Sequence, residues 1–415
     1  MSPQVFLTII LVIIAIDFLF EQFLDYLNLK QPRKLPALLE GIYEQEKYEQ
    51  SIAYHKAQTN FSFITSTFSF VLTFVVISSG LFGSLDGWLR GFFSHEITIS
   101  LAFVGIIFLV SDIINLPFQL YSTFVIEEKF DFNKMTPKLF VIDKLKGYLL
   151  GLLLGGLILS ILLALIIYLG QSFWIYFFVV ICLFLLLMNM FYTSWILPLF
   201  NKLTPLEEGP LKTAIENYAA KVAFPLDHIM VIDGSKRSNK ANAFFSGLGK
   251  KKKIVLYDTL VKHHTEEELV AVLAHEVGHY KKKHIVTGFA LSLVQIGVML
   301  FIMSLLIFNP ILSEALGASQ LSIPVNLIAF GILYSPISKI AGILMQMVSR
   351  KNEYEADAYA ANTYHASALI DALKKLSVNN LSNLVPHQLY VFFHYSHPPL
   401  LQRLKALHAL SRSKN

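Results

Sequence analysis

The run GYLLGLLLGGLILSILLALIIYLG, residues 147–170, contains no charged side chain. A helix that crosses a bilayer needs about 20 predominantly apolar residues. Similar runs recur along the chain, and together they predict seven spans, at residues 4–24, 62–83, 99–121, 147–169, 173–193, 285–308 and 323–345. The first run could instead be a signal peptide, but it lacks a basic segment before it and a small-residue cleavage site after it. We therefore expect a mainly α-helical, multi-pass membrane protein.

The composition of the chain agrees with this fold class. Of its 415 residues, 54% are hydrophobic and 15% are charged, whereas soluble proteins carry about 25% charged residues. The single cysteine, Cys182, excludes an intrachain disulfide and a cysteine-based zinc site. The net charge of +5 is small for this length. We attribute this charge to the basic residues that set membrane topology, and we expect no nucleic-acid partner.

Connections rich in lysine and arginine alternate along the chain with connections that hold few of these residues. The segments 29–61, 122–146, 194–284 and the tail after 346 hold 5, 5, 14 and 8 of them. The connections 84–98, 170–172 and 309–322 hold one or none. By the positive-inside rule, the N-terminus lies outside and the C-terminus is cytoplasmic. A bacterial inner membrane and an endoplasmic reticulum membrane fit this pattern equally well.

The motif His275-Glu276-Val277-Gly278-His279 lies on the predicted cytoplasmic side, shortly before the sixth span. Two histidines four positions apart share one face of a helix, and the preceding residues 266–274 are good helix formers. Two imidazoles so placed can bind one Zn²⁺, and Glu276 can take a proton from the attacking water. A polar helix face with two surface histidines is the alternative interpretation.

A catalytic zinc site needs a third protein ligand. Glu353 and Asp357, which follow the seventh span, are four positions apart in a predicted helix and share a face, whereas Glu355 points elsewhere. Glu353 as a ligand and Asp357 as a hydrogen-bond partner of a ligating histidine would form a coherent site. On spacing alone, a solvated acidic helix face explains the pattern equally well.

Two further segments are candidates for substrate contacts. Residues 241–247 and 254–258 are predicted to form a short β-hairpin, whose free edge could bind an extended peptide, with Asn242 adding a side-chain contact. A purely structural hairpin is the alternative. His397 precedes a predicted helix with an apolar stripe, where a capping or surface role is equally plausible. No pattern supports a role for His263, His264, His284 or His394.

Six stretches spread over the whole chain carry a resemblance to a known family. They are Tyr121–Phe130 with Phe132-Asn133; Ser238 with Asn242-Ala243-Phe244; Ile254–Leu260; His275–His279; Glu353–Asp357; and His397-Pro398-Pro399 with Arg403. Together they resemble the type I CAAX prenyl proteases, which are integral-membrane zinc metallopeptidases. The Glu-x-x-x-Asp pattern is shared with the wider family, including HtpX-type quality-control proteases. The Thr-Phe-Val-Ile-Glu-Glu stretch at 123–128 and the seven-helix plan favour the CAAX branch.

The resemblance implies a fold and a role for each site residue. Family members form a ring of seven membrane helices around a water-filled chamber that the zinc site faces. One Zn²⁺ per chain would be held by His275, His279 and Glu353, with Glu276 as general base, Asp357 orienting a ligand, His397 and Arg403 near the scissile bond, and Asn242, Ala243 and Phe244 binding substrate. We expect residues 1–193 to form a membrane domain of five helices. Residues 194–415 would form a zinc metallopeptidase domain with two further spans.

The predicted function is therefore that of a zinc endopeptidase at the cytoplasmic face of a lipid bilayer, acting on peptide or protein substrates. By resemblance, it would remove the C-terminal tripeptide of prenylated CaaX proteins. A general quality-control protease of HtpX type is the first alternative. A transporter is disfavoured because the predicted ligands lie outside the spans. A non-catalytic scaffold or translocon regulator is disfavoured because Glu276 is intact.

Overall fold

The computed structural model describes residues 2–32, 34–35, 37–41, 44–246 and 252–412, and it is mainly helical. The α-helices are α1 (Pro3–Lys30), α2 (Gln45–Ser78), α3 (Leu81–Arg90), α4 (Glu96–Tyr121), α5 (Pro137–Leu150), α6 (Gly156–Leu169), α7 (Phe173–Phe191), α8 (Leu197–Phe200), α9 (Pro210–Lys221), α10 (Asp258–His263), α11 (Glu266–Lys281), α12 (His284–Leu306), α13 (Pro310–Ala315), α14 (Ile323–Thr363), α15 (Ala366–Asn379), α16 (Gln388–His394) and α17 (Leu400–Arg412). Short 3-10 helices are η1 (Ala37–Leu39), η4 (Gly170–Ser172) and η6 (Gly234–Lys236), and π-helical turns are η2 (Ser122–Glu127), η3 (Gly151–Gly155) and η5 (Tyr192–Ile196). The strands are β1 (Leu203–Pro205), β2 (Leu226–Ile232), β3 (Ala243–Ser246) and β4 (Lys252–Tyr257).

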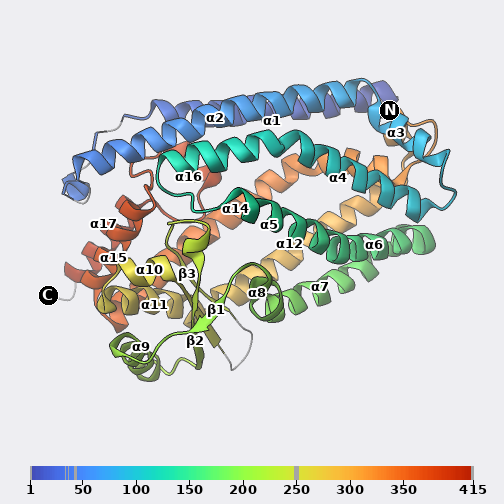
Figure 1. The fold of residues 1–415 in the computed structure, drawn as a ribbon. Coiled ribbons are helices and arrows are strands. Elements are labelled where there is room, and N and C mark those ends of the chain that lie inside the picture. Colours follow the sequence, from blue (N-terminus) through green and yellow to red (C-terminus); the bar gives the residue numbers. More distant parts are fainter. Residues whose placement is uncertain (1, 33, 36, 42–43, 247–251, 413–415) are drawn as a thin grey trace.

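Within the described residues, six continuous helical stretches are long and apolar enough to cross a bilayer. The fourth, Pro137–Phe200, has 64 residues and contains both predicted spans 147–169 and 173–193, far more than the about 20 residues of one crossing. The chain reverses at Gly170, whose φ of 55° lies in the left-handed region that favours glycine. Helices α6 and α7 therefore pack side by side (Figure 1). The structure is consistent with seven spans, and the two termini lie at opposite ends of the bundle, as an odd number of crossings requires (Figure 1).

The second and seventh predicted spans differ from the observed helices at their ends. Helix α2 ends at Ser78, and the left-handed Gly80 separates it from α3, so the predicted boundary at residue 83 was wrong. Helix α14 has 41 residues and continues well beyond the predicted end at 345. Glu353 and Asp357 consequently lie on the same continuous helix as the last candidate membrane span.

A four-stranded sheet in the order β1-β2-β4-β3 accompanies the helices. Its antiparallel pair β3 and β4 confirms the predicted hairpin, with Ala243 opposite Leu256, although residues 247–251 lie outside the described residues. Strand β2 is parallel to β4 and antiparallel to β1. Strands β1 and β2 were not predicted from the sequence. Strand β3 forms one edge of the sheet and lies beside α11.

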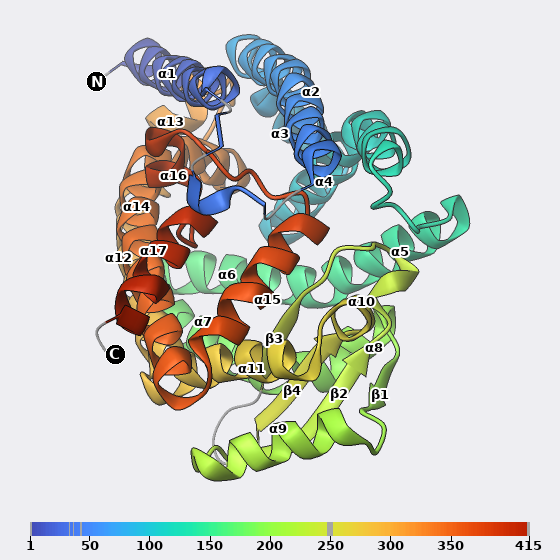
Figure 2. The same ribbon diagram turned by 90° about the vertical axis from the view of Figure 1, so that its left-hand side faces the viewer.

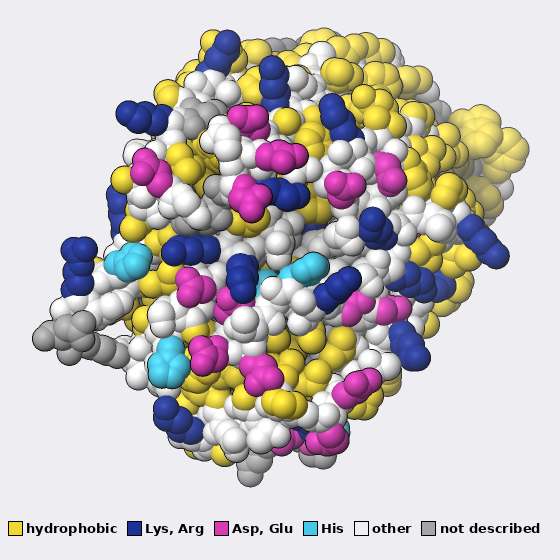
Figure 3. All heavy atoms as spheres, turned by 60° about the vertical axis from the view of Figure 1, so that its left-hand side comes forward, with side chains coloured by type: hydrophobic (Ala, Val, Ile, Leu, Met, Phe, Trp, Pro, Cys, Tyr) yellow, Lys and Arg dark blue, Asp and Glu magenta, His cyan; other side chains and the backbone are white. Residues whose placement is uncertain are grey.

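The long helices form a ring when the molecule is viewed from the end that carries the sheet (Figure 2), as the resemblance implies; the water-filled chamber stays a prediction. Charged side chains gather over this end, whereas hydrophobic side chains cover the flank behind it (Figure 3). Helix α11 is enclosed here by α9, α14 and α15. Its Leu269, Val270, Leu273, Ala274 and Val277 are buried in the largest core cluster of the described residues.

Candidate metal centre

Helix α11 has a well-defined start that sets the position of its two histidines. Thr265 Oγ1 accepts a hydrogen bond from Glu268 N at 3.3 Å, and Glu268 Oε2 accepts one from Thr265 N at 2.9 Å, which together make a capping box. Glu266 and Glu267 add negative charge to the first turn, where the helix dipole favours it. The helix then runs to Lys281, so that His275 and His279 lie on one face near its end.

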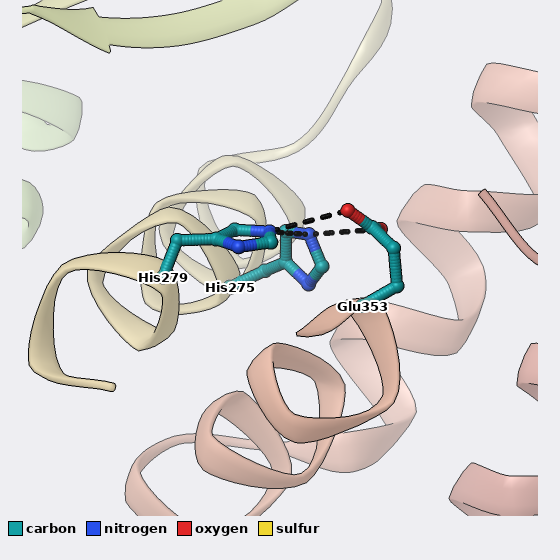
Figure 4. A group of neighbouring side chains, drawn as sticks. All are labelled: His275, His279 and Glu353. Carbon is teal, nitrogen blue, oxygen red and sulfur yellow. Dashed lines mark hydrogen bonds and ion pairs between the residues drawn. The ribbon is translucent and has the colours of Figure 1, made fainter. Parts of the chain in front are cut away.

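His275 and His279 of α11 meet Glu353 of α14 at one point (Figure 4). One ligand atom from each residue lies within 4.8 Å of the other two. The two Nε2 atoms are 3.2 Å apart. The Glu353 oxygens lie 3.4 Å from His275 Nε2 and 3.3 Å from His279 Nε2. Glu353 is 4% exposed and His275 is 8% exposed, so the alternatives of a solvated acidic face and of two surface histidines were wrong.

The nitrogen and oxygen atoms that face the middle of this cluster can accept a proton or bind a cation. Asp357 Oδ1 lies 2.8 Å from His275 Nδ1; because an ionised carboxylate only accepts, we assign the ring hydrogen to Nδ1, and the Nε2 lone pair faces Glu353. Glu353 Oε2 is buried, and its neighbours His275 Nε2 and Arg403 Nη1 lie 3.4 Å and 3.5 Å away, too far or too poorly aligned for a hydrogen bond. Burial lowers the pKa of His275, but the carboxylates of Asp357 and Glu353 outweigh it and raise the pKa to about 9, so that a positive charge is favoured between Nε2 and Glu353. The centre therefore favours a positive charge, and two imidazoles with one carboxylate fit a divalent metal cation.

A cavity of about 270 Å³ opens beside this cluster, and Glu276 lines it. His275, His279, Glu353, His397 and Arg403 line the same cavity, together with Asn242, Ala243, Leu260, Val272, Leu369, Leu373 and Leu376. Burial raises the pKa of Glu276, which brings the carboxylate closer to the neutral range in which a general base works best. The cavity thus combines a cluster that could hold a metal ion, a potential base and apolar walls.

His397 and Arg403 both reach the cluster from the C-terminal segment, but they differ in exposure. Arg403 on α17 donates from Nε and Nη2 to the two Asp357 oxygens at 2.8 Å and 2.6 Å, and its side chain is 11% exposed. His397 Nε2 lies 3.3 Å from Glu353 Oε1, and its side chain is 64% exposed. The Arg403 guanidinium is thus occupied in holding Asp357, whereas His397 is open to the cavity.

The predicted substrate segment divides into two parts. Asn242 and Ala243 line the cavity, whereas Phe244 packs against the separate cluster of Leu197, Ile232 and Val255. Ala243 and Phe244 are successive residues of β3 and therefore point to opposite faces, whereas Asn242 precedes the strand and does not follow this alternation. Asn242 O accepts from Tyr257 N of β4 at 3.1 Å, so Ala243 N faces the free edge, where the Asn242 side chain accepts from it at 2.9 Å.

Two residues at the cluster were missed by the sequence analysis. His284, the first residue of α12, is 8% exposed, and its Nδ1 lies 3.0 Å from His279 Nδ1. Glu355 does point away from the cluster, as predicted, but its Oε2 lies 3.2 Å from His284 Nε2. In the sequence, these residues are marked only by their proximity to the two motifs, and proximity does not tell where a side chain points.

The Gly278→Ala substitution is expected to destabilise the protein by about 1–3 kcal/mol and to weaken metal binding. An added Cβ would lie 2.9 Å from Ala356 Cα and 3.0 Å from Ala356 O. These are backbone atoms of α14, so the strain is relieved by separating α11 from α14, the helices that carry His275, His279 and Glu353. Thermal unfolding and metal titration of the purified protein in detergent check this expectation.

Gly288→Ala in α12 is the matched control, because a Cβ at Gly288 meets no atom within 4 Å. It should leave the unfolding midpoint and the metal affinity almost unchanged. Equal losses in the two variants would show that the close approach at Gly278 has no special importance.

Two family models match the chain in succession. The model described as CAAX prenyl protease N-terminal, five membrane helices, matches residues 25–202, and Peptidase family M48 matches residues 205–411. A solved structure, the crystal structure of S. mikatae Ste24p, superposes with a TM-score of 0.92 at 34% identity, covering 97% of this chain and 99% of that chain.

Curated relatives cover almost the same extent. CAAX prenyl protease 1 homolog of Oryza sativa subsp. japonica is 38% identical, over 97% of both chains. CAAX prenyl protease 1 of Saccharomyces cerevisiae is 34% identical, over 96% of this chain and 94% of its own. CAAX prenyl protease 1 homolog of Homo sapiens is 33% identical, over 92% of this chain and 90% of its own. With this identity over nearly its whole length, and with His275, His279 and Glu353 placed so that they could hold a metal ion, the chain belongs to the CAAX prenyl protease family within peptidase family M48, and it is an integral-membrane metalloendopeptidase.

Proposed function

We propose that this protein is a zinc-dependent endopeptidase that removes the C-terminal tripeptide of prenylated CaaX proteins at the cytoplasmic face of its membrane. One observation carries the proposal: His275, His279 and Glu353 converge beside Glu276 in a cavity that an edge strand also lines. We further propose that the chain divides into a membrane domain, 1–193, and a metallopeptidase domain, 194–415, with two more spans.

Zinc is the metal that suits this donor set. Two histidines and one glutamate are a known protein ligand set of catalytic zinc, in which a fourth position stays open. When bound, zinc would supply polarisation of the scissile carbonyl and a lowered pKa, of about 7, for water at the open position. His275, His279 and Glu353 would hold it, and Asp357 would keep His275 in the ligating tautomer.

The remaining steps belong to side chains of the cavity. Glu276 accepts the proton of the attacking water and afterwards donates it to the leaving amine. His397, the more exposed of the two C-terminal candidates, donates a hydrogen bond to the substrate carbonyl as negative charge develops there. Arg403 keeps Asp357 and, through Nη1 at 3.5 Å, Glu353 in position.

The substrate backbone would lie along the free edge of β3 as an added strand. The Asn242 side chain already accepts from Ala243 N, a position that a peptide carbonyl can take over when Asn242 turns away. Phe244 would contribute by fixing the strand against its apolar cluster and not by touching substrate.

The location of the site suits lipidated substrates. Helix α12, which is long and apolar enough to span a bilayer, begins at His284, shortly after His279. A prenylated cysteine anchors a protein to the membrane surface, which raises its concentration near a site at that level. The relatives named CAAX prenyl protease 1 support this substrate class. The excess of lysine and arginine at alternate connections supports a cytoplasmic active site and an external N-terminus.

Purified protein is expected to cleave a farnesylated CaaX peptide after its cysteine and to leave the unprenylated peptide of the same sequence largely intact. The measurement is mass spectrometry of both products, with Glu276→Gln as the inactive control. Equal cleavage of both peptides would replace the proposed substrate class with general quality-control proteolysis of HtpX type. Cleavage of neither by the metal-loaded protein would favour a scaffold.

A further inference from the structure

The two ligating histidines differ in what lies behind them. His275 is backed by a carboxylate, that of Asp357. His279 is backed by a second imidazole, because its Nδ1 lies 3.0 Å from His284 Nδ1. The two rings are 5.1 Å apart between centroids and inclined by 73°. The side chain of His284 is only 7% exposed, so water does not compete freely for this contact.

Glu355 completes a chain of three side chains. Its Oε2 lies 3.2 Å from His284 Nε2, and an ionised carboxylate only accepts, so the His284 hydrogen belongs on Nε2. Neutral His284 then presents a lone pair at Nδ1, and His279 must donate from its own Nδ1. His279 Nε2 is left without a hydrogen and faces Glu353 at 3.3 Å. With both imidazoles neutral, the His279–His284 and His284–Glu355 contacts are both hydrogen bonds. His279 is then in the tautomer that can bind a metal through Nε2.

The backbone is shaped to make these contacts. Between α11 and α12, Lys283 adopts left-handed dihedrals, φ 59° and ψ 26°, which are uncommon for a residue other than glycine. This residue breaks the helix and lets His284 turn back onto His279. On α14, Glu353 and Glu355 are two positions apart and point in different directions. One carboxylate therefore faces the metal position while the other reaches His284.

We propose that His284 and Glu355 are a positioning pair that fixes the tautomer and the ring orientation of His279, and thereby sets the affinity of the site for its metal. The inference rests on the metal site of the proposed function. Neither residue touches the substrate cavity as lined by the described residues, so the pair acts through His279.

The test is a metal titration of the full-length protein in detergent, by competition with a chromophoric zinc chelator. His284→Phe, which keeps a ring but removes the acceptor, is expected to weaken zinc binding by about 10–100-fold. His284→Gln, whose amide oxygen can accept from His279 Nδ1, should recover part of this loss. Glu355→Gln should weaken binding less than His284→Phe and should add nothing in the His284→Phe background.

Two controls and a spectrum separate positioning from packing. Lys351→Ala removes the Lys351–Glu355 pair, 3.7 Å, without touching His284, and His263→Ala removes an exposed histidine; both should bind zinc like the wild type. The visible absorption of the Co²⁺-substituted protein should shift in His284→Phe and not in the controls. A lower unfolding midpoint with unchanged zinc affinity and an unchanged spectrum would show a structural role and overturn the inference.

The outcomes also distinguish this inference from the proposed function. A wild type that binds no metal would defeat both. A wild type that binds zinc and cleaves peptide, with His284→Phe binding equally tightly, would defeat only the positioning role. Additive losses in the double variant would defeat the coupling between His284 and Glu355.

Discussion

Replacing Glu276 with glutamine is expected to lower kcat/KM for peptide cleavage by about 10²–10⁴-fold, with zinc affinity unchanged. Glutamine has the same shape but cannot accept a proton. Glu276 lines the cavity beside the cluster but is not one of its three converging ligand residues, so the substitution removes the base and leaves the ligands in place. Steady-state kinetics and metal content of the same preparation measure the two effects together.

Glu267→Gln is a suitable control, because Glu267 is an exposed glutamate in the first turn of the same helix. It should retain wild-type kinetics. A Glu276→Gln protein with more than about a tenth of the wild-type rate would exclude Glu276 as the principal base, since general-base contributions are larger than this.

Replacing Glu353 with glutamine is expected to remove both metal and activity. The substitution keeps the volume of the side chain but withdraws the negative charge from the point where two imidazole nitrogens converge. The loss of zinc affinity should exceed the about 10–100-fold typical of groups that only orient a ligand. Metal analysis after gel filtration measures it.

Asp371→Asn provides the comparison for this variant, because the Asp371 side chain on α15 is 58% exposed. It should bind zinc normally. If Glu353→Gln retained full zinc affinity, the cluster between α11 and α14 would not be the metal site, and the catalytic scheme built on it would fail.

The membrane fold and the α11 motif follow from short-range patterns. An apolar run such as 147–170 specifies a spanning helix wherever it lies, because no water in the bilayer can satisfy its backbone. His275 and His279 share a face because helix geometry alone puts them there. Spacing proposed Glu353 as a ligand but could not exclude a solvated acidic face, because the pattern of an acidic helix face is the same in solvent and in a core; the resemblance favoured the ligand role.

The assembly of the candidate metal site depended on contacts between segments that are distant in the sequence. The approach of α11 to α14 is possible because Gly278 lacks a side chain at Ala356, and this packing brings Glu353 to the histidines. His284 was overlooked because its direction is set by the left-handed Lys283 and not by a helical repeat. Local patterns thus specify which helices form and which of their faces are polar. Which faces meet is decided by the complementary packing of side chains, a property that no single stretch of the chain possesses.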